Sequence, residues 1–227
     1  MTREVHALRP DAAAWYSGIL DEVTAVLPSS LDRARQFLEP IAGEVWMGTL
    51  TLHGPATAGS EVRSSRRVSD RTRAEVFLRD GFVCTYCGGR TIPRCILAAI
   101  SDVFPDGFPY YAHYRRGTVH PAYWALAPEA DHVLAHAGGG SSDPENLTTL
   151  HAMCNTRKSS LDAASLSVAA APAHDSEWDG LLSRYARIVA AGENTGRRHA
   201  APGYHPSWLR RFERSLLPVE DISNARP

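Results

Sequence analysis

The sequence of 227 residues lacks a long apolar run, and no stretch reaches the roughly 18 apolar residues of a membrane-spanning helix. Its start, MTREVHALRPDAAAWY, also lacks the basic end, apolar block and small-residue cleavage site of a secretory signal. We therefore expect a cytoplasmic protein that does not interact with a membrane.

Cysteine is scarce, with only 4 in the chain, and a protein of this length can bury a core without disulfide bonds. Cys84 and Cys87 form a Cys-x-x-Cys pair, which in a reducing compartment indicates a metal site or a redox centre. A redox protein would place the pair in a thioredoxin-like βαβ pattern, and none surrounds Cys84. The metal interpretation is therefore favoured, and zinc analysis tests it.

A net charge is almost absent, because 24 basic residues face 25 acidic ones. The basic residues are unevenly placed: 7 arginines and 3 acids lie between Arg63 and Arg90. Such a surface favours nucleic acid, since phosphate binding depends on where the cations lie. Charge alone is equally compatible with solvated helix faces. A second cluster near the C-terminus contains Arg197, Arg198, Arg210, Arg211 and Arg214.

Heptads and internal repeats are also absent, and helical periodicity dominates the pattern. Residues 10–27 and 29–47 read as two helices, with Asp11 and Ser30 as N-caps. A segment rich in Gly, Ala and Ser places a soft boundary near residue 60, and the last ten residues should be frayed. Further helices are expected in the segments that follow Ser69, in 94–104, in 178–191 and in 206–217.

Two metal-ligand half-sites stand far apart in the chain. Cys84 and Cys87 form the first, and His151 and Cys154, in a His-x-x-Cys, form the second. A structural zinc ion takes four nitrogen and sulfur ligands, so together they predict one tetrahedral site. The separation exceeds that of short zinc fingers, and the alternative is that the cysteines are small core residues.

Polar residues gather between and after these half-sites. Asp131-His132 comes first, followed by the loop AGGGSSDPE and then Asn146, while Asn155 and Lys158 follow Cys154. With the preceding RDGFVCTYCG, this order of elements resembles the HNH endonuclease family, over residues 71–162. The resemblance implies an α+β protein with a small ββα-metal core, a structural zinc site and surrounding N- and C-terminal helices. It also implies DNA cleavage with Mg²⁺ or Mn²⁺, leaving 5′-phosphate and 3′-hydroxyl ends.

The chemistry of phosphodiester hydrolysis suits these side chains. Adjacent strand residues project to opposite sides, so His132 can act as general base while Asp131 holds the divalent cation. Asn155 can supply a second oxygen to that cation. The resemblance implies that same role for Asn155, and that Asn146 orients His132. Lys158, one turn beyond Asn155, is placed to meet a phosphate.

Two departures from the family pattern leave questions open. Many zinc-bearing members have Cys-x-x-Cys in the second half-site, whereas this chain has His151 in the first position. On an ideal helix His151 and Asn155 would point within roughly 40° of each other, so His151 serves zinc only if it lies at or before the first helical turn. The alternative is that it faces the catalytic cation. The long insertion, 88–129, either lines the nucleic acid or packs over the zinc module. The residues of the insertion considered for either role are Tyr110, Tyr111, His113, Tyr114, Arg115, Arg116, His120 and Trp124.

The sequence thus predicts a nuclease domain at 61–165, between an N-terminal helical region at 1–60 and a C-terminal one at 166–227. The expected substrate is double-stranded DNA, and cutting both strands would suggest a homodimer. Restriction, phage defence and mobile-element roles all remain open. The alternative is a zinc-stabilised nucleic-acid-binding module that does not cut.

Overall fold

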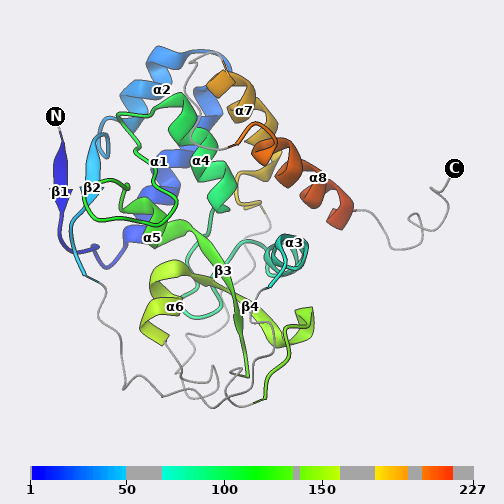
Figure 1. Ribbon diagram of the computed structural model, residues 1–227. Helices are drawn as coiled ribbons and strands as arrows, with labels where there is room; N and C mark the ends of the chain where they lie inside the picture. Colours follow the sequence, from blue (N-terminus) through cyan, green and yellow to red (C-terminus); the bar gives the residue numbers. More distant parts are fainter. Residues whose placement is uncertain (1, 50–67, 135–138, 159–176, 194–200, 217–227) are drawn as a thin grey trace, which may run out of the picture.

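The computed structural model describes residues 2–49, 68–134, 139–158, 177–193 and 201–216. It is a mixed α+β structure, as expected, in which α1, α2, α4 and α7 lie on one side and the hairpin β3–β4 with α6 on the other (Figure 1). In chain order the helices and strands are β1 (Arg3–Val5), α1 (Ala12–Val26), α2 (Leu31–Leu38), β2 (Glu44–Trp46), α3 (Asp70–Arg79), α4 (Arg94–Val103), α5 (Ala122–Leu126), β3 (Pro128–His132), β4 (Leu147–His151), α6 (Ala152–Lys158), α7 (Tyr185–Glu193) and α8 (Tyr204–Leu216).

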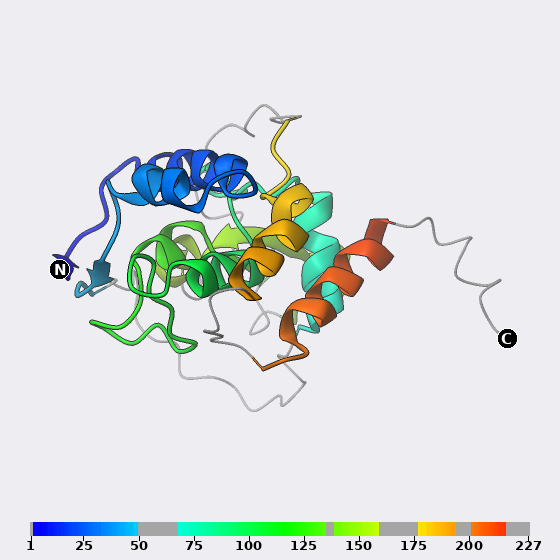
Figure 2. The ribbon, with the colours of Figure 1, turned by 90° about the horizontal axis from the view of Figure 1, so that it is seen from above.

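Helix α4 is the centre of the helical part. Every residue from Cys95 to Val103 is buried, as expected of a helix that is covered on all sides. Its one buried acid, Asp102, accepts a hydrogen bond from His205 Nε2 of α8 at 3.0 Å, and His205 Nδ1 lies 2.8 Å from the Tyr185 hydroxyl of α7. This polar chain fixes α7 and α8 against α4, and α8 also lies beside α3 (Figure 2).

The starts of both N-terminal helices were predicted correctly, but the end of the second helix was not. Ser30 caps α2 by accepting a hydrogen bond from the Arg33 amide at 3.2 Å, as expected. Asp11 makes no such cap, because its carboxylate binds Arg9 Nε at 2.7 Å. The predicted helix 29–47 is wrong after Leu38, because Pro40 cannot continue the helical hydrogen bonds.

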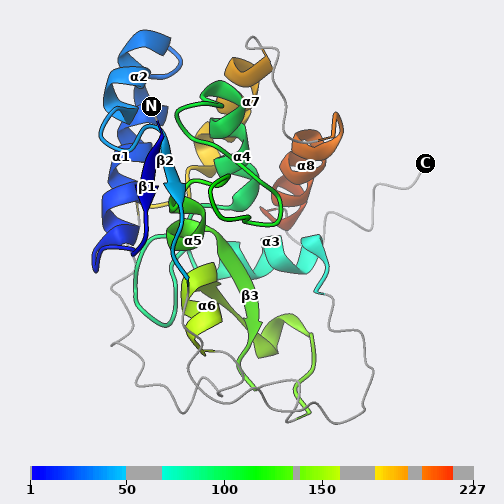
Figure 3. The ribbon, with the colours of Figure 1, turned by 60° about the vertical axis from the view of Figure 1, so that its left-hand side comes forward.

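Residues 44–46 form a strand in place of that predicted helix end. β2 pairs with β1 in parallel, with Arg3 opposite Glu44 and Val5 opposite Trp46 (Figure 3). The partner strand comes from the start of the chain, so no local pattern announces it. Val45 and Trp46 of this strand are buried.

Most of the insertion, 88–129, is buried, and its exposed residues lie mainly in the loop between α4 and α5. His120 and Tyr123 are completely buried in the helical part, where His120 Nε2 donates to the Ile41 carbonyl at 2.9 Å. Tyr111, Arg115 and other residues of the preceding loop are exposed. Both helices of the insertion, α4 and α5, are therefore core elements of the helical part.

The remaining helix predictions hold with shifted ends. Ser69 caps α3 by accepting from the Thr72 amide at 3.1 Å. α7 begins later than expected, because Leu181 has a left-handed backbone with φ of 66°. The expected boundaries near residues 60 and 166 and the frayed tail lie outside the described residues, so the division into three regions stays a prediction. None of the described helices is long and apolar enough to span a membrane.

Candidate catalytic hairpin and metal centre

Strands β3 and β4 form an antiparallel hairpin with a fixed register. Glu129 lies opposite Leu150, Asp131 opposite Thr148, and His132 opposite Leu147. Residues that face each other across a hairpin share a face, and alternate residues of one strand do so too. Glu129, Asp131 and Leu150 therefore project from one face, and His132 projects from the other.

Helix α6 covers the face that carries Asp131. Leu150 packs with Met153 and Cys154 at the start of α6, and Glu129 lines a cavity together with Asn155. Because Asp131 projects from the same face two residues after Glu129, its carboxylate and the Asn155 amide belong to one side of the hairpin. Their sharing of one cation stays a prediction.

His132 stands at the last position of β3. Its side chain is half-buried, and its Nε2 lies 3.1 Å from the Ser142 hydroxyl. Ser142 comes from the loop that returns to β4, and its hydroxyl can donate to or accept from the ring. The imidazole therefore remains within reach of solvent while one of its nitrogens has a hydrogen-bond partner.

Asn146 holds together the chain on either side of the loop. Its Oδ1 accepts from the Leu134 amide at 2.9 Å, and its Nδ2 donates to the carbonyls of Leu134 at 3.1 Å and Ser141 at 2.8 Å. A side chain at Gly140 would come within 1.9 Å of the Leu134 carbonyl oxygen, so this close approach requires glycine. Asn146 thus orders the backbone that directly follows His132.

Lys158 closes α6, and its side chain lies outside the part of the chain that the structure describes. Its expected contact with a phosphate therefore stays a prediction.

The four expected metal ligands come together. The ligand atoms of Cys84, Cys87, His151 and Cys154 all lie within 4.8 Å of one another. His151 Nδ1 is 3.3 Å from the Cys87 sulfur and 3.8 Å from the Cys154 sulfur. Ligand atoms around a tetrahedral zinc ion lie roughly 3.3–3.8 Å apart, given its bond lengths to sulfur and nitrogen. The cluster is therefore consistent with a structural zinc site.

His151 is oriented toward the three sulfurs by its backbone position and by its second nitrogen. It is the last residue of β4, ahead of the first turn of α6, as a zinc role requires. Its Nε2 donates to the Arg90 carbonyl at 2.9 Å, which leaves Nδ1 as the lone-pair nitrogen. A side chain at Gly89 would come within 2.9 Å of His151 Cε1, so glycine is needed behind the ring.

The thiols of this cluster affect one another. Hydrogen bonds from the Cys154 and Cys87 thiols lower the pKa of Cys84, while the same contact with Cys84 raises the pKa of Cys154. Cys95 does not belong to the cluster: it is buried in α4, and burial raises the pKa of its thiol to about 12. The three cysteines of the cluster thus differ from Cys95, which serves as a core residue.

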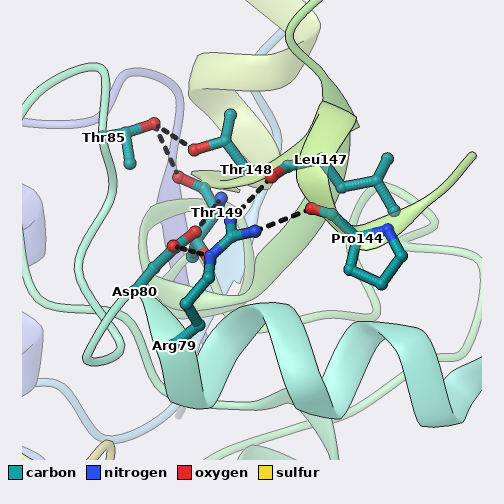
Figure 4. A network of polar contacts seen from close by, with 7 residues as sticks. All are labelled: Arg79, Asp80, Thr85, Pro144, Leu147, Thr148 and Thr149. Carbon is teal, nitrogen blue, oxygen red and sulfur yellow. Dashed lines mark hydrogen bonds and ion pairs between the residues drawn. The ribbon is translucent and has the colours of Figure 1, made fainter. Parts of the chain in front are cut away.

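A polar network fixes the hairpin to the end of α3 (Figure 4). The Arg79 guanidinium donates to the carbonyls of Pro144 and Leu147, each at 2.7 Å. Asp80 accepts from Arg79 Nε at 2.7 Å and from the Thr149 amide at 2.8 Å. The hydrogen bond to Asp80 raises the pKa of Arg79. The two residues therefore hold both ends of the segment that contains Asn146.

Sequence reasoning did not assign Arg79, Asp80 or Ser142. Arg79 and Asp80 belong to the quoted motif RDGFVCTYCG, but only its cysteines were interpreted. Ser142 lies in the loop AGGGSSDPE, where nothing local distinguishes it from Ser141. All three act through contacts with distant parts of the chain or with a folded loop.

Comparison with known proteins identifies the hairpin region. Residues 125–161 match a family model described as HNH endonuclease, which spans β3, the loop, β4 and α6. Neither the curated proteins nor the solved structures gave a match to the chain. Since the match, the β-hairpin followed by a helix, and the cluster of cysteines and histidine agree, the chain contains an HNH endonuclease domain at residues 125–161.

Proposed function

We propose that this protein is an endonuclease that hydrolyses DNA phosphodiester bonds with the help of a divalent cation. The observation that carries the proposal is the hairpin register, with Asp131 on the face covered by α6 and the half-buried His132 next to it. A phosphate bound across this strand end would be within reach of both side chains.

In this proposal His132 is the general base. A neutral imidazole accepts a proton from water near pH 7, and general-base catalysis contributes roughly 10²–10⁴-fold to a rate. The Ser142 hydroxyl, 3.1 Å from Nε2, supports the ring orientation. Asn146 acts through the backbone, because its amide fixes Leu134 two residues beyond His132.

Asp131 and Asn155 would hold the cation, Mg²⁺ or Mn²⁺. A carboxylate and an amide oxygen suit such a hard ion, whose other ligands are phosphate oxygens and water. When bound, the ion supplies charge stabilisation for the phosphorane-like transition state and the leaving oxygen. Lys158 is assigned to a neighbouring phosphate.

The zinc site would act as a scaffold for these residues. Cys154 is proposed to bind zinc through the first turn of α6, and Asn155 is the next residue. Fixing Cys154 therefore fixes the start of α6 and the direction in which Asn155 projects. We assign Cys84, Cys87, His151 and Cys154 to this structural Zn²⁺.

The test is nicking of supercoiled plasmid DNA by the full chain with Mg²⁺ or Mn²⁺. We expect His132→Ala to lose at least about 10²-fold in rate, because it removes the proton acceptor. The matched control is His6→Ala, since His6 is an exposed histidine in the N-terminal segment, and it should nick like the wild type. Zinc content and melting temperature are measured on each variant to exclude unfolding.

The outcomes separate the two functional classes. Equal nicking by wild type and His132→Ala would overturn the assignment of the base. A wild-type protein that binds DNA without nicking it under any of these conditions would instead support a non-cleaving, zinc-stabilised binding module. Double-strand breaks, together with a dimeric mass in solution, would support the expected homodimer.

A further inference from the structure

Two neighbouring hollows lie between the hairpin and the helices. The first, of about 210 Å³, is formed by α3, the start of α4, the loop after α4, the start of β3, and α8. The second, of about 280 Å³, extends to α6 and includes Asn155 in its wall. Arg94 and Ala112 belong to both walls, so the two hollows adjoin. The first hollow thus adjoins a second one whose wall includes the proposed cation ligand Asn155.

Aromatic side chains dominate the wall of the first hollow. Tyr110 comes from the insertion loop, Tyr204 and Trp208 from α8, and Phe77 from α3. Figure 2 shows α8 alongside α3, which brings these rings together from distant parts of the sequence. At the boundary with the second hollow, the Arg94 guanidinium lies 4.9 Å above the Tyr114 ring. Flat surfaces of this kind suit a planar ligand.

The charges around the first hollow largely cancel. Arg94 binds Glu129 at 2.6 Å and Arg73 lies 3.7 Å from the same carboxylate. Asp70, also in the wall, lies 3.7 Å from Arg211. A phosphate gains little where arginines are already paired with carboxylates. The hollow therefore favours a neutral group over an anion.

Two residues of these walls each carry a buried polar atom. Arg73 Nε belongs to a residue of the first wall, and Trp124 Nε1 belongs to a residue of the second. Among the described residues each is buried and has no hydrogen-bond partner. An unsatisfied buried polar atom costs about 1–3 kcal/mol, so a turn of the Arg73 side chain toward a polar occupant of the first hollow would offset such a cost.

From this chemistry we infer that the first hollow receives a nucleobase turned out of the DNA stack beside the cleaved bond. A base is planar, neutral and rich in hydrogen-bonding groups, and it is smaller than the ligands of drug-sized pockets, which span roughly 300–1,000 Å³. The inference rests on the proposed nuclease function, because it takes the phosphate near Asn155 as the fixed point. It assigns base selection to Tyr110 and Trp208.

The inference gives the protein a source of specificity that its hairpin lacks. Contacts to phosphates position a protein on DNA but carry no sequence information. Turning out a base costs a few kcal/mol, and least where the base is unpaired. DNA with an unpaired base should therefore bind more tightly than fully paired DNA.

The experiment is fluorescence anisotropy with the full, zinc-loaded chain in the absence of a catalytic cation. Three duplexes of one sequence are compared: fully paired, with one unpaired adenosine, and with an abasic unit in place of that adenosine. The last two share a distorted backbone and differ only in the base. We expect the wild type to bind the unpaired adenosine about tenfold more tightly than the abasic duplex, as stacking on an aromatic ring implies.

Tyr110→Ala and Trp208→Ala should each reduce the ratio of the affinity for the unpaired-adenosine duplex to the affinity for the abasic duplex toward one. Neither substitution should weaken binding to paired DNA. The controls Tyr111→Ala and Trp15→Ala remove exposed rings of the same chemistry outside the hollow and should keep the ratio. Melting temperatures verify folding, and Trp208, which is partly exposed, serves as the second variant if Tyr110→Ala unfolds.

Equal affinity of the wild type for the adenosine and abasic duplexes would overturn the inference. An affinity ratio equal to that of the wild type in both Tyr110→Ala and Trp208→Ala would also overturn it. Plasmid nicking is scored separately. Nicking without base discrimination removes the base pocket and leaves the nuclease proposal intact. Discrimination without nicking keeps the pocket and removes the nuclease proposal.

Discussion

The helical part and the hairpin part of this protein are stabilised in different ways. The helical part, α1, α2, α4, α5, α7 and α8, shares a large apolar core in which α4 is completely enclosed. The hairpin part, comprising residues 82–91, β3, β4 and α6, contributes Phe82 and Leu147 to that core and also has a small cluster of its own, formed by Cys84, Leu150, Met153 and Cys154. Two of these are proposed zinc ligands. We therefore expect the hairpin part to depend more than the helical part on metal and polar contacts.

Removal of the metal should have the largest effect on the difference in stability between the hairpin part and the helical part. We expect Cys154→Ser, or treatment with a zinc chelator, to abolish the zinc content and nicking, because structural zinc contributes about 10–16 kcal/mol to the folding of zinc-finger peptides. Hydrogen exchange should lose its protection in Leu147–His151 and α6, while α4 stays protected. The matched control is Cys95→Ser, which lies in α4 outside the cluster and should keep zinc.

A Cys154→Ser protein that retains one zinc per chain and a protected β4 would contradict the proposed ligand set. Simultaneous loss of protection in α4 would show that the two parts unfold as one unit.

Acid should act on the helical part through His120. This residue is buried and neutral, its Nε2 donating to Ile41 and its Nδ1 accepting from the Ala122 amide at 3.1 Å. Burial lowers its pKa to about 3, whereas an unfolded histidine has a pKa of about 6.5. Between these values the unfolded chain takes up a proton that the folded protein does not. The free energy of unfolding therefore falls as the pH drops below about 6.5, by about 1.4 kcal/mol per pH unit for one proton.

Chemical denaturation across this pH range measures the effect. Glu44, 3.8 Å from His120 Nε2, has a pKa raised by burial and opposes the trend in acid, because its folded form binds a proton more readily. A His120→Gln variant retains Glu44 and should show a flatter pH dependence than the wild type. His113→Gln, at an exposed histidine, should keep the wild-type slope. Parallel slopes for all three proteins would rule out His120 as the source.

The sequence anticipated what depends on local chemistry or on fixed spacing. Ser30 and Ser69 mark helix starts because a cap is made within one turn. The zinc ligands were found because each half-site is a short motif, and folding only had to join them. The sequence also required His151 to lie at or before the first helical turn if it is to bind zinc, and His151 does lie ahead of α6.

What the sequence did not reveal depends on partners far along the chain. Strand β2 forms because β1 lies beside it, and the apolar residues of 39–47 are equally compatible with a helix. His120 was considered as a possible nucleic-acid contact, yet it is a completely buried core residue. The roles of Arg79 and Asp80 arise from carbonyls and an amide more than sixty positions away, which leave no trace in residue type.

Arg79 offers the mildest way to sharpen the comparison, because it positions the hairpin part without contributing to either apolar core. Its side chain is 45% exposed, so Arg79→Met should cost only about 1 kcal/mol of stability. The nicking rate should fall further, by about tenfold, because the freed carbonyls of Pro144 and Leu147 flank Asn146, and small displacements of catalytic groups are costly. Thermal melting and nicking at saturating DNA measure the two effects.

The control Arg35→Met breaks an exposed pair with Asp32 on α2, and neither stability nor nicking should change appreciably. A loss of nicking that only follows the loss of stability would make Arg79 a general structural residue. If turnover falls while the zinc content, the melting temperature and the DNA affinity stay nearly unchanged, catalysis requires that the hairpin be held in position as well as folded. The proposed zinc site would anchor the start of α6, while Arg79 binds the Leu147 carbonyl at the opposite end of β4.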